Sequence, residues 1–410
     1  MLKTTIFAVA AVALYAGAAP AGQAAPPPGA PLTFAAALDL ATSRNLDLEA
    51  ARRQRAIREA GLTIAREWAN PDVSFEATRD TPHENLTFGL PVEIGGQRGR
   101  RIGVAREELS LADLDVRAAM ATLRRNLRLA FYGLLAADQR VRLANEVLDL
   151  AERARSVAQA RFDEGDVPRL DVLQADLGVA RARTDADLAR ATRASALADL
   201  NAVLNQPPGR AVSVVGDLGE APPIPGFDRA IALAGASNVA ILSAGRDAAV
   251  EGKRLDLLRA DRVPTPTVTF GLPMNAPGEY NVGASVGVMM TVPLFSRNQG
   301  EIAQSQATID QAHAMGDAAR RQVESQVYSA LARIEAQRQQ VESFRTRVVP
   351  AAEELATLAE ESYKAGRDSV LALLDAQRSL RDVRLQYLQA LLDFQAALAD
   401  LEEVIGGPIA

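Results

Sequence analysis

The chain has 410 residues, of which 48% are hydrophobic and only 4% aromatic, and its formal charge is −6. This composition is typical of long helices rather than of several compact cores, and the mild negative charge gives no support to nucleic-acid binding. The sequence contains no cysteine, which excludes disulfides, thiolate metal sites and a lipid-modified N-terminal cysteine.

The N-terminus has the pattern of a secretory signal peptide. Lys3 precedes an apolar run over residues 6–19, and small residues that suit a cleavage site follow it. The run is too short to span a membrane as a helix, and no later stretch approaches about 18 uninterrupted apolar residues. We therefore expect residues 1–24 to be a signal peptide and the mature chain to be exported without a helical membrane anchor.

The first half of the mature chain changes its hydrophobic period twice. Helical spacing predicts one helix over residues 33–68. Alternating apolar and polar residues over 72–78 and again over 86–90 predict a β-hairpin with a polar loop. Helical spacing then returns and predicts a rod from about Arg98 to Phe162, roughly 100 Å long at 1.5 Å per residue.

A turn and a shorter helix follow the rod, and the whole order then recurs. Segments 161–205 and 362–406 align without a gap, and the pentapeptide Ala-Leu-Ala-Asp-Leu occurs in both. Such self-similarity indicates a tandem duplication. The predicted organisation is a signal peptide at 1–24, a first repeat at 25–205, a proline-rich linker at 206–227 and a second repeat at 228–410. The second repeat is predicted to contain a helix over 228–262, strands over 267–272 and 282–292, a rod over 297–363 and, after a turn at Gly366, a helix to Ile405.

The alternating segments permit two interpretations. Most such patterns belong to a half-buried sheet of a soluble domain, but export, long apolar faces and small or polar opposite faces favour a barrel with a wet interior. Four strands are too few to close a membrane barrel, since about eight is the minimum. Three copies would supply twelve strands.

The helices also permit two interpretations. Apolar residues form a seam at 3–4 spacing along the last helix, from Leu380 to Ile405, and further leucines lie on a neighbouring face. An ordinary antiparallel bundle would explain one broad buried stripe. Separate apolar stripes would instead let each helix contact neighbours on both sides, as in a hollow cylinder.

The sequence resembles the TolC-like outer-membrane efflux proteins over almost the whole mature chain. The resemblance rests on LTFAAALDLATSRN near the start, on Asn70-Pro71 before the first strand, and on RFDEGDVPRLDVLQA and SYKAGRDSVLALLDA after the two rods. The segments PVEIGGQRGRRIGVAREE and FYGLLAADQRVRLA are most similar to the CzcC-like heavy-metal branch.

The resemblance implies a mainly α-helical homotrimer with a small β part in the outer membrane of a Gram-negative bacterium. A twelve-stranded β-barrel, in contact with outer-membrane lipid, would continue into a long periplasmic α-helical barrel. The implied function is a passive exit duct for heavy-metal cations. The implied partners are a periplasmic adaptor and an inner-membrane, proton-driven pump.

Two kinds of site residue follow from the resemblance. In this family the helical tips contact the adaptor, and acidic rings often line the periplasmic mouth just past the second tip. Asp375 matches one such ring position, whereas Ala372 occupies another; an aspartate there is otherwise a solvated surface residue. The residues expected at the adaptor-contact tips are Gly165, Asp166, Val167, Gly366, Arg367 and Asp368, although both glycines also suit a turn with positive φ.

The search for catalytic motifs in the sequence finds none, and we expect neither an enzyme nor a cofactor. His83 and His313 lie far apart and have no ligand partner at short spacing. Alternative functions are a duct of the same fold for drugs, other small molecules or type I secretion, a periplasmic coiled-coil adaptor, and a coiled-coil scaffold. The adaptor lacks a tandem duplication, and the scaffold would leave the signal peptide and strands unexplained.

Overall fold

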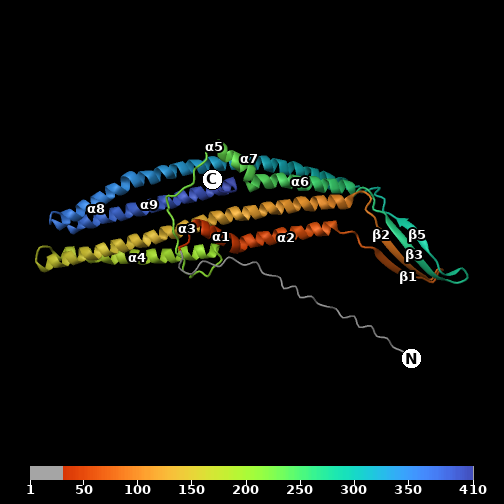
Figure 1. Ribbon diagram of the computed structural model, residues 1–410, viewed down its shortest axis with the longest axis horizontal. Coiled ribbons are helices and arrows are strands. Elements are labelled where there is room, and N and C mark those ends of the chain that lie inside the picture. Colours follow the sequence, from red (N-terminus) through yellow and green to blue (C-terminus); the bar gives the residue numbers. More distant parts are fainter. Residues whose placement is uncertain (1–30, 410) are drawn as a thin grey trace, which may run out of the picture.

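The computed structural model describes residues 31–409, so the expected signal peptide lies outside the described residues. The molecule is a long rod with a small β-sheet at one end and two helical hairpin tips at the other (Figure 1). Within residues 31–409, no helix has the length and apolarity needed to cross a membrane.

Two short helices, rather than the single helix predicted over 33–68, open the chain: α1 (Phe34–Arg44) and α2 (Leu46–Arg66). Asn45 separates them because its side-chain oxygen accepts the N–H of Leu48 at 3.0 Å and caps α2. Its amide nitrogen donates to the carbonyl of Val203 at 3.2 Å, 158 residues along the chain. The break is thus fixed by a tertiary contact.

The second half has the same break, so the helix predicted over 228–262 is also two helices, α5 (Phe227–Ser237) and α6 (Val239–Ala260). Asn238 caps α6 by accepting the N–H of Ile241 at 3.2 Å. Its amide donates to the carbonyl of Val404 at 2.7 Å. Asn45 and Asn238 therefore have the same role in the two halves: each caps a helix and donates to a distant carbonyl.

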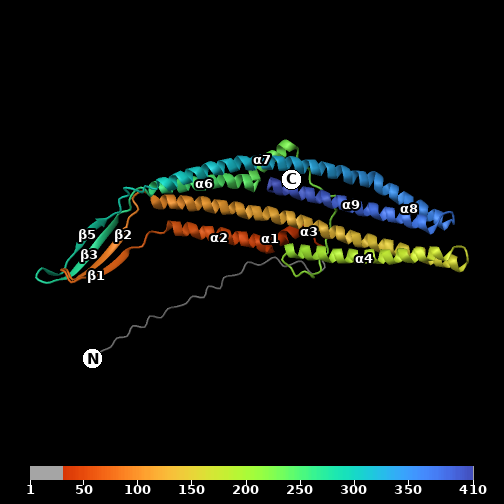
Figure 2. The ribbon, with the colours of Figure 1, turned by 180° about the vertical axis from the view of Figure 1, so that it is seen from behind.

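The first rod is α3 (Gln97–Asp163), which turns back into α4 (Arg169–Val203). Its 67 residues give a length of roughly 100 Å, as predicted. Helices α2 and α4 lie end to end along α3 (Figures 1 and 2). One long helix thus carries the chain from the sheet to the first tip.

The second rod is interrupted, which the sequence analysis did not predict. It consists of α7 (Gln299–Ser343), a π-helical turn (Phe344–Val348) and α8 (Val349–Lys364), and α9 (Val370–Ile405) returns along it. Within the turn, the N–H of Val349 donates to the carbonyl of Phe344, five residues back. Pro350 explains the widened turn, since its ring would clash with the carbonyl four residues back in a regular α-helix.

The sheet is antiparallel and mixes strands from both halves. Its strands are β1 (Asp72–Ala77), β2 (Glu84–Pro91), β3 (Thr267–Ala276), β4 (Tyr280–Val282) and β5 (Ser285–Met289). The order is β1-β2-β3, with β4 and β5 both paired to β3 in one continuous register. The last two are therefore parts of one strand. The strand predicted over 282–292 ends earlier, at Met289, which pairs with Thr267, the first residue of β3.

The register sorts the side chains of the sheet by face. Val73, Phe88, Phe270 and Val286 lie opposite one another in a single row across the strands. Directly paired residues share a face and alternate residues point to opposite faces. One face is therefore apolar, and the other carries small or polar residues such as Thr87, Gly271 and Ser285.

The core lies midway along the rod, where α1 and the linker wrap the long helices. Phe131 of α3 is fully buried against Phe34, with ring centroids 5.7 Å apart. The side-chain amide of Gln395 on α9 donates to two linker carbonyls, those of Leu218 and Glu220, at 2.8 Å each. This packing fixes the linker and leaves both ends of the rod free for other contacts.

Candidate functional site at the paired helical tips

A left-handed glycine closes the first tip, between α3 and α4. Gly165 has φ +84°, and its N–H donates to the carbonyl of Phe162 at 3.0 Å. The N–H of Asp166 donates to the carbonyl of Arg161 at 2.8 Å. These paired bonds are the common way in which glycine ends a helix, because a Cβ disfavours positive φ. Asp166 is exposed, and Val167 is half-buried before α4 begins.

The second tip, between α8 and α9, repeats this turn. Gly366 has φ +71°, its N–H donates to the carbonyl of Tyr363, and the N–H of Arg367 donates to that of Ser362, both at 3.0 Å. Arg367 and Asp368 are exposed. All six residues expected at the tips therefore lie in two matching turns at the end of the rod far from the sheet (Figure 2).

One arginine joins the two tips within the chain. Arg161 on α3 donates from Nη2 to the carbonyl of Tyr363 at 3.2 Å, and its guanidinium lies 4.9 Å from the centre of the Tyr363 ring. Tyr363 is only 4% exposed, and this burial raises the pKa of its phenol, while the charge of Arg161 opposes the rise. The aligned residue of the first tip, Phe162, is 38% exposed.

The tips differ in charge although their backbones match. The first tip exposes three carboxylates, those of Asp163, Glu164 and Asp166. The second tip exposes the cations Lys364 and Arg367 beside Asp368. A partner that contacts both tips would therefore meet two electrostatically distinct surfaces.

Asp375 lies on α9 a short way past the second tip. Its exposed carboxylate accepts from Nη1 of Arg378 at 3.2 Å, one turn further along the helix. A single chain brings it near the tips but supplies no second copy of the carboxylate. Across residues 31–409, no group of three or more His, Cys, Asp or Glu side chains is arranged to hold a metal ion.

Sequence reasoning missed the contact between Arg161 and Tyr363. The gap-free alignment contained a signal for it, because Arg161 falls on Ser362 and Phe162 on Tyr363. Where the two tips meet, the first tip thus has an arginine in place of serine, and the second has a tyrosine in place of phenylalanine. The arginines that lie between α4 and α9 were not predicted either.

Comparison with known proteins identifies the family. The model of the outer membrane efflux protein family matches residues 37–206 and 231–407. The cobalt-zinc-cadmium resistance protein CzcC of Cupriavidus metallidurans is 29% identical over 278 residues, which are 66% of this chain and 65% of that protein. The nickel and cobalt resistance protein CnrC of the same organism is 28% identical over 301 residues, 67% of this chain and 69% of that protein.

Solved structures have the same fold. The Campylobacter jejuni CmeC outer membrane channel superimposes with a TM-score of 0.76 at 15% identity, over 91% of this chain and 85% of that chain. The structure of CusC gives 0.74 at 17% identity, over 91% and 92%. The alignment with CzcC spans slightly under two thirds of that relative's length. Because the two family matches together cover most of the sequence, the chain belongs to the outer membrane efflux protein family.

Proposed function

We propose that three copies of the chain form an outer-membrane exit duct, with a twelve-stranded β-barrel continued by a periplasmic α-helical barrel. The apolar face of the sheet carries this proposal. Phe75, Phe270 and Val286 on this face are 62%, 44% and 76% exposed in one chain. Contact with lipid acyl chains would cover them, while the small and polar opposite face suits a wet interior.

The edges of the sheet support assembly from several copies. Strands β1 and β5 each have a described partner on one side only. A membrane interior leaves no water for the unpaired backbone groups of such edges, so they must pair with another strand. Three copies joined edge to edge would pair every edge and exceed the minimum of about eight strands.

Heavy-metal cations are the proposed cargo. Two relatives are named for resistance to cobalt, zinc and cadmium or to nickel and cobalt, and they support this assignment. In this proposal the duct is passive and is not an enzyme. A proton-driven pump in the inner membrane supplies the energy, and a periplasmic adaptor joins the pump to the duct.

The tips and Asp375 have separate roles in this duct. Two matching tips per chain give a ring of six in a trimer, which the adaptor would contact. Three copies of Asp375 would converge at the periplasmic mouth and attract cations. The pairing of Asp375 with Arg378 would weaken this attraction.

Adjacent residues of β1 provide the test of the barrel. Val73 lies on the apolar face and Ser74 on the opposite face. Val73→Arg should cost about 2–4 kcal/mol near the bilayer midplane and reduce the outer-membrane trimer, whereas Ser74→Arg should preserve it. The measurements are trimer content of the outer membrane and growth on cobalt, zinc and cadmium of a strain lacking the gene. A monodisperse monomer without detergent, or equal effects of both variants, would contradict the proposal.

A further inference from the structure

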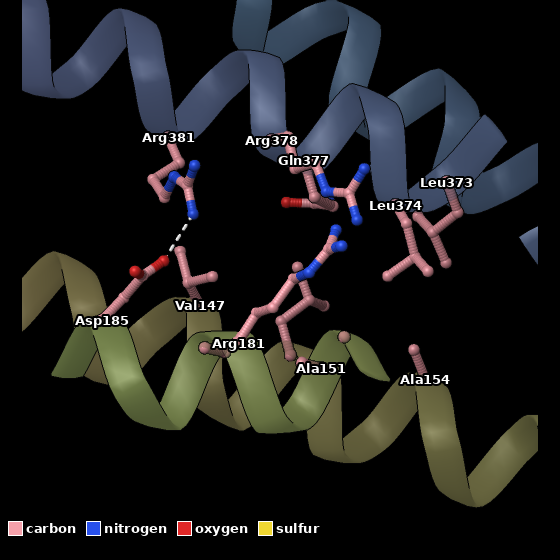
Figure 3. Close-up of a pocket in the computed structure, with 13 residues that line it drawn as sticks. Val147, Ala151, Ala154, Arg181, Asp185, Leu373, Leu374, Gln377, Arg378 and Arg381 are labelled. Atoms are coloured by element: carbon pink, nitrogen blue, oxygen red, sulfur yellow. Dashed lines mark hydrogen bonds and ion pairs between the residues drawn. The ribbon is translucent and has the colours of Figure 1, made fainter. Parts of the chain in front are cut away.

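A cavity of about 360 Å³ separates the two helical hairpins near their tips. Figure 3 shows it between α4 below and α9 above, with α3 behind α4. Its apolar wall includes Val147, Ala151 and Leu374. Its polar lining comes from Arg181 and Asp185 on α4 and from Gln377, Arg378 and Arg381 on α9.

The cavity holds more positive than negative charge. Arg381 and Asp185 form an ion pair across it at 2.6 Å. Arg378 pairs with Asp375, which does not line the cavity, at 3.2 Å. In the described part of the chain, Arg181 has no carboxylate within 4.0 Å. The lining thus contains three guanidinium groups and one carboxylate.

The arginines approach the cavity from opposite hairpins. Arg181 points up from α4 and Arg378 points down from α9, so that their guanidinium groups face each other with no carboxylate between them (Figure 3). Like charges held in this way repel, but water screens part of the repulsion, because Arg181 is exposed and the Arg378 side chain is 41% exposed. A ligand with several anionic oxygens would relieve the repulsion and could accept hydrogen bonds from both planar groups.

We propose that this cavity binds a small, multiply charged oxyanion of the phosphate class, which bridges Arg181 and Arg378. The amide of Gln377 adds a polar group to the lining. The bound anion would connect α4 to α9 alongside the Arg381–Asp185 ion pair. The site is complete within one chain, so binding does not depend on trimer formation or on metal transport.

The internal repeat limits the site to one per chain. The counterparts of Arg378 and Arg381 in the first repeat, 201 positions earlier, are Leu177 and Ala180. The counterpart of Arg181 in the second repeat is Asp382. Where these counterpart positions face a neighbouring copy in a trimer, the contact would thus lack all three cavity arginines. A trimer should therefore bind three anions rather than six.

Equilibrium dialysis with radiolabelled inorganic phosphate tests the site on the purified full chain in detergent at low salt. Binding should saturate at one phosphate per chain. Arg181→Ala and Arg378→Gln should each weaken it at least about tenfold, because each removes charge-assisted hydrogen bonds. Sulfate should compete with phosphate better than acetate, which carries a single charge.

Arg183→Ala is the matched control. Arg183 lies two residues from Arg181 on α4, is exposed, pairs with Glu152 and does not line the cavity. This variant should bind phosphate as the unmodified chain does. Size-exclusion chromatography verifies that each variant keeps its assembly state. Absence of saturable binding, unchanged binding in Arg181→Ala, or an equal loss in Arg183→Ala would overturn the proposal.

Discussion

The two hairpins of one chain meet through side chains whose counterparts in the other repeat remain exposed. Leu374 on α9 packs within reach of Gly178 on α4, 3.6 Å from the position that a Cβ of Gly178 would occupy. Its counterpart Leu173 is 54% exposed. On the rods, Ala154 is 6% exposed and its counterpart Leu355 is 51% exposed. Each chain thus has one joint in which both hairpins pack together around the cavity, here called the filled joint, and two unfilled half-joints, which neighbouring copies would complete.

The filled joint is also the more polar one. It contains the Arg161–Tyr363 contact and the Asp185–Arg381 ion pair. At the corresponding positions of the unfilled half-joints, Ser362 replaces Arg161, and Ala180 replaces Arg381. The two halves therefore share the backbone of the hairpins but differ in the side chains at the two kinds of joint.

The two halves should differ most in the stability that is lost when the residue directly after the shared pentapeptide is replaced. This residue is Asn201 in the first half and Glu402 in the second. Glu402 is 5% exposed and pairs with the buried Arg128 at 3.0 Å. Glu402→Ala should lower the free energy of unfolding by about 3–5 kcal/mol, because it leaves the charge of Arg128 buried and unpaired. Asn201→Ala should cost about 1–3 kcal/mol, since it removes neutral hydrogen bonds to the carbonyls of Pro208 and Arg210.

Urea unfolding of the detergent-solubilised protein, followed by helical circular dichroism, measures both losses. Combining Glu402→Ala with Arg128→Met should restore part of the stability, because no buried charge then lacks a partner. Equal losses in the two single variants would show that Glu402 and Asn201 contribute equally to stability.

An exchange of residues at the ends of α4 and α9 sharpens the comparison. Asn205 and Gly406 correspond, with φ +50° and +86°. A Cβ at position 406 would lie 2.4 Å from the carbonyl oxygen of Ser237. Gly406→Asn should therefore cost about 3 kcal/mol by overpacking, although asparagine tolerates positive φ. Asn205→Gly should change stability by less than about 1 kcal/mol.

Thermal unfolding of the two single variants tests this difference. The exchange isolates the steric contact, because the same pair of residues is swapped in opposite directions. A small effect of Gly406→Asn would mean that α5 and α6 can move away from the end of α9.

Valine at either tip glycine tests the equivalence of the tips. Gly366→Val and Gly165→Val should each strain the turn by about 1–2 kcal/mol, because both positions have positive φ. The strain should be similar at both glycines, because a Cβ at Gly366 would lie 3.7 Å from Nη2 of Arg161, an ordinary contact distance, and a Cβ at Gly165 would meet nothing within 4 Å. Both variants should still form outer-membrane trimer, since the tips lie far from the sheet, but should lose metal resistance and adaptor cross-linking.

Ala365→Val is the control for the tips. Ala365 is exposed next to Gly366 but has φ −77°, so valine there avoids the strain of a positive φ. It should retain resistance and cross-linking. Full resistance in Gly366→Val, with normal cross-linking, would remove the turn geometry from the mechanism.

The sequence was sufficient to predict the elements that depend on local pattern. The rods, the paired strands and the tip turns follow from hydrophobic period and from two glycines. The breaks at Asn45 and Asn238 depend on carbonyls of Val203 and Val404, more than 150 residues away. A local signal existed at the first break, because Asp47 and Glu49 follow Asn45 as acidic residues follow a helix cap.

The contacts of the site that were not predicted also join residues far apart in the sequence. Arg161 and Tyr363 are 202 residues apart, and the cavity arginines Arg181 and Arg378 meet only because two hairpins pack side by side. Periodicity indicates which face of a helix is apolar, but it does not indicate which helix covers that face. The aligned repeats would have supplied part of this information, because the filled joint and the unfilled half-joints have different residues at equivalent positions.

The smallest expected effect is the pH dependence of the Tyr363 tip. Burial raises the pKa of Tyr363 above its ordinary value of 10.0, so the folded chain keeps a proton that the unfolded chain releases. The resulting stability is complete below pH 10 and is lost as the pH rises from there through the raised pKa. Tyr363→Phe should remove this contribution and reduce the alkaline slope by at most about 1.4 kcal/mol per pH unit. Burial also raises the pKa of Tyr132 and Tyr387, so a slope should remain. Phe162→Tyr is the control, because a phenol at position 162 is more exposed than that of Tyr363 and should add less to the alkaline slope. Urea unfolding at pH 8 to 11 gives the slopes, and an unchanged slope in Tyr363→Phe would show that the phenol ionises in the folded tip as it does in the unfolded chain.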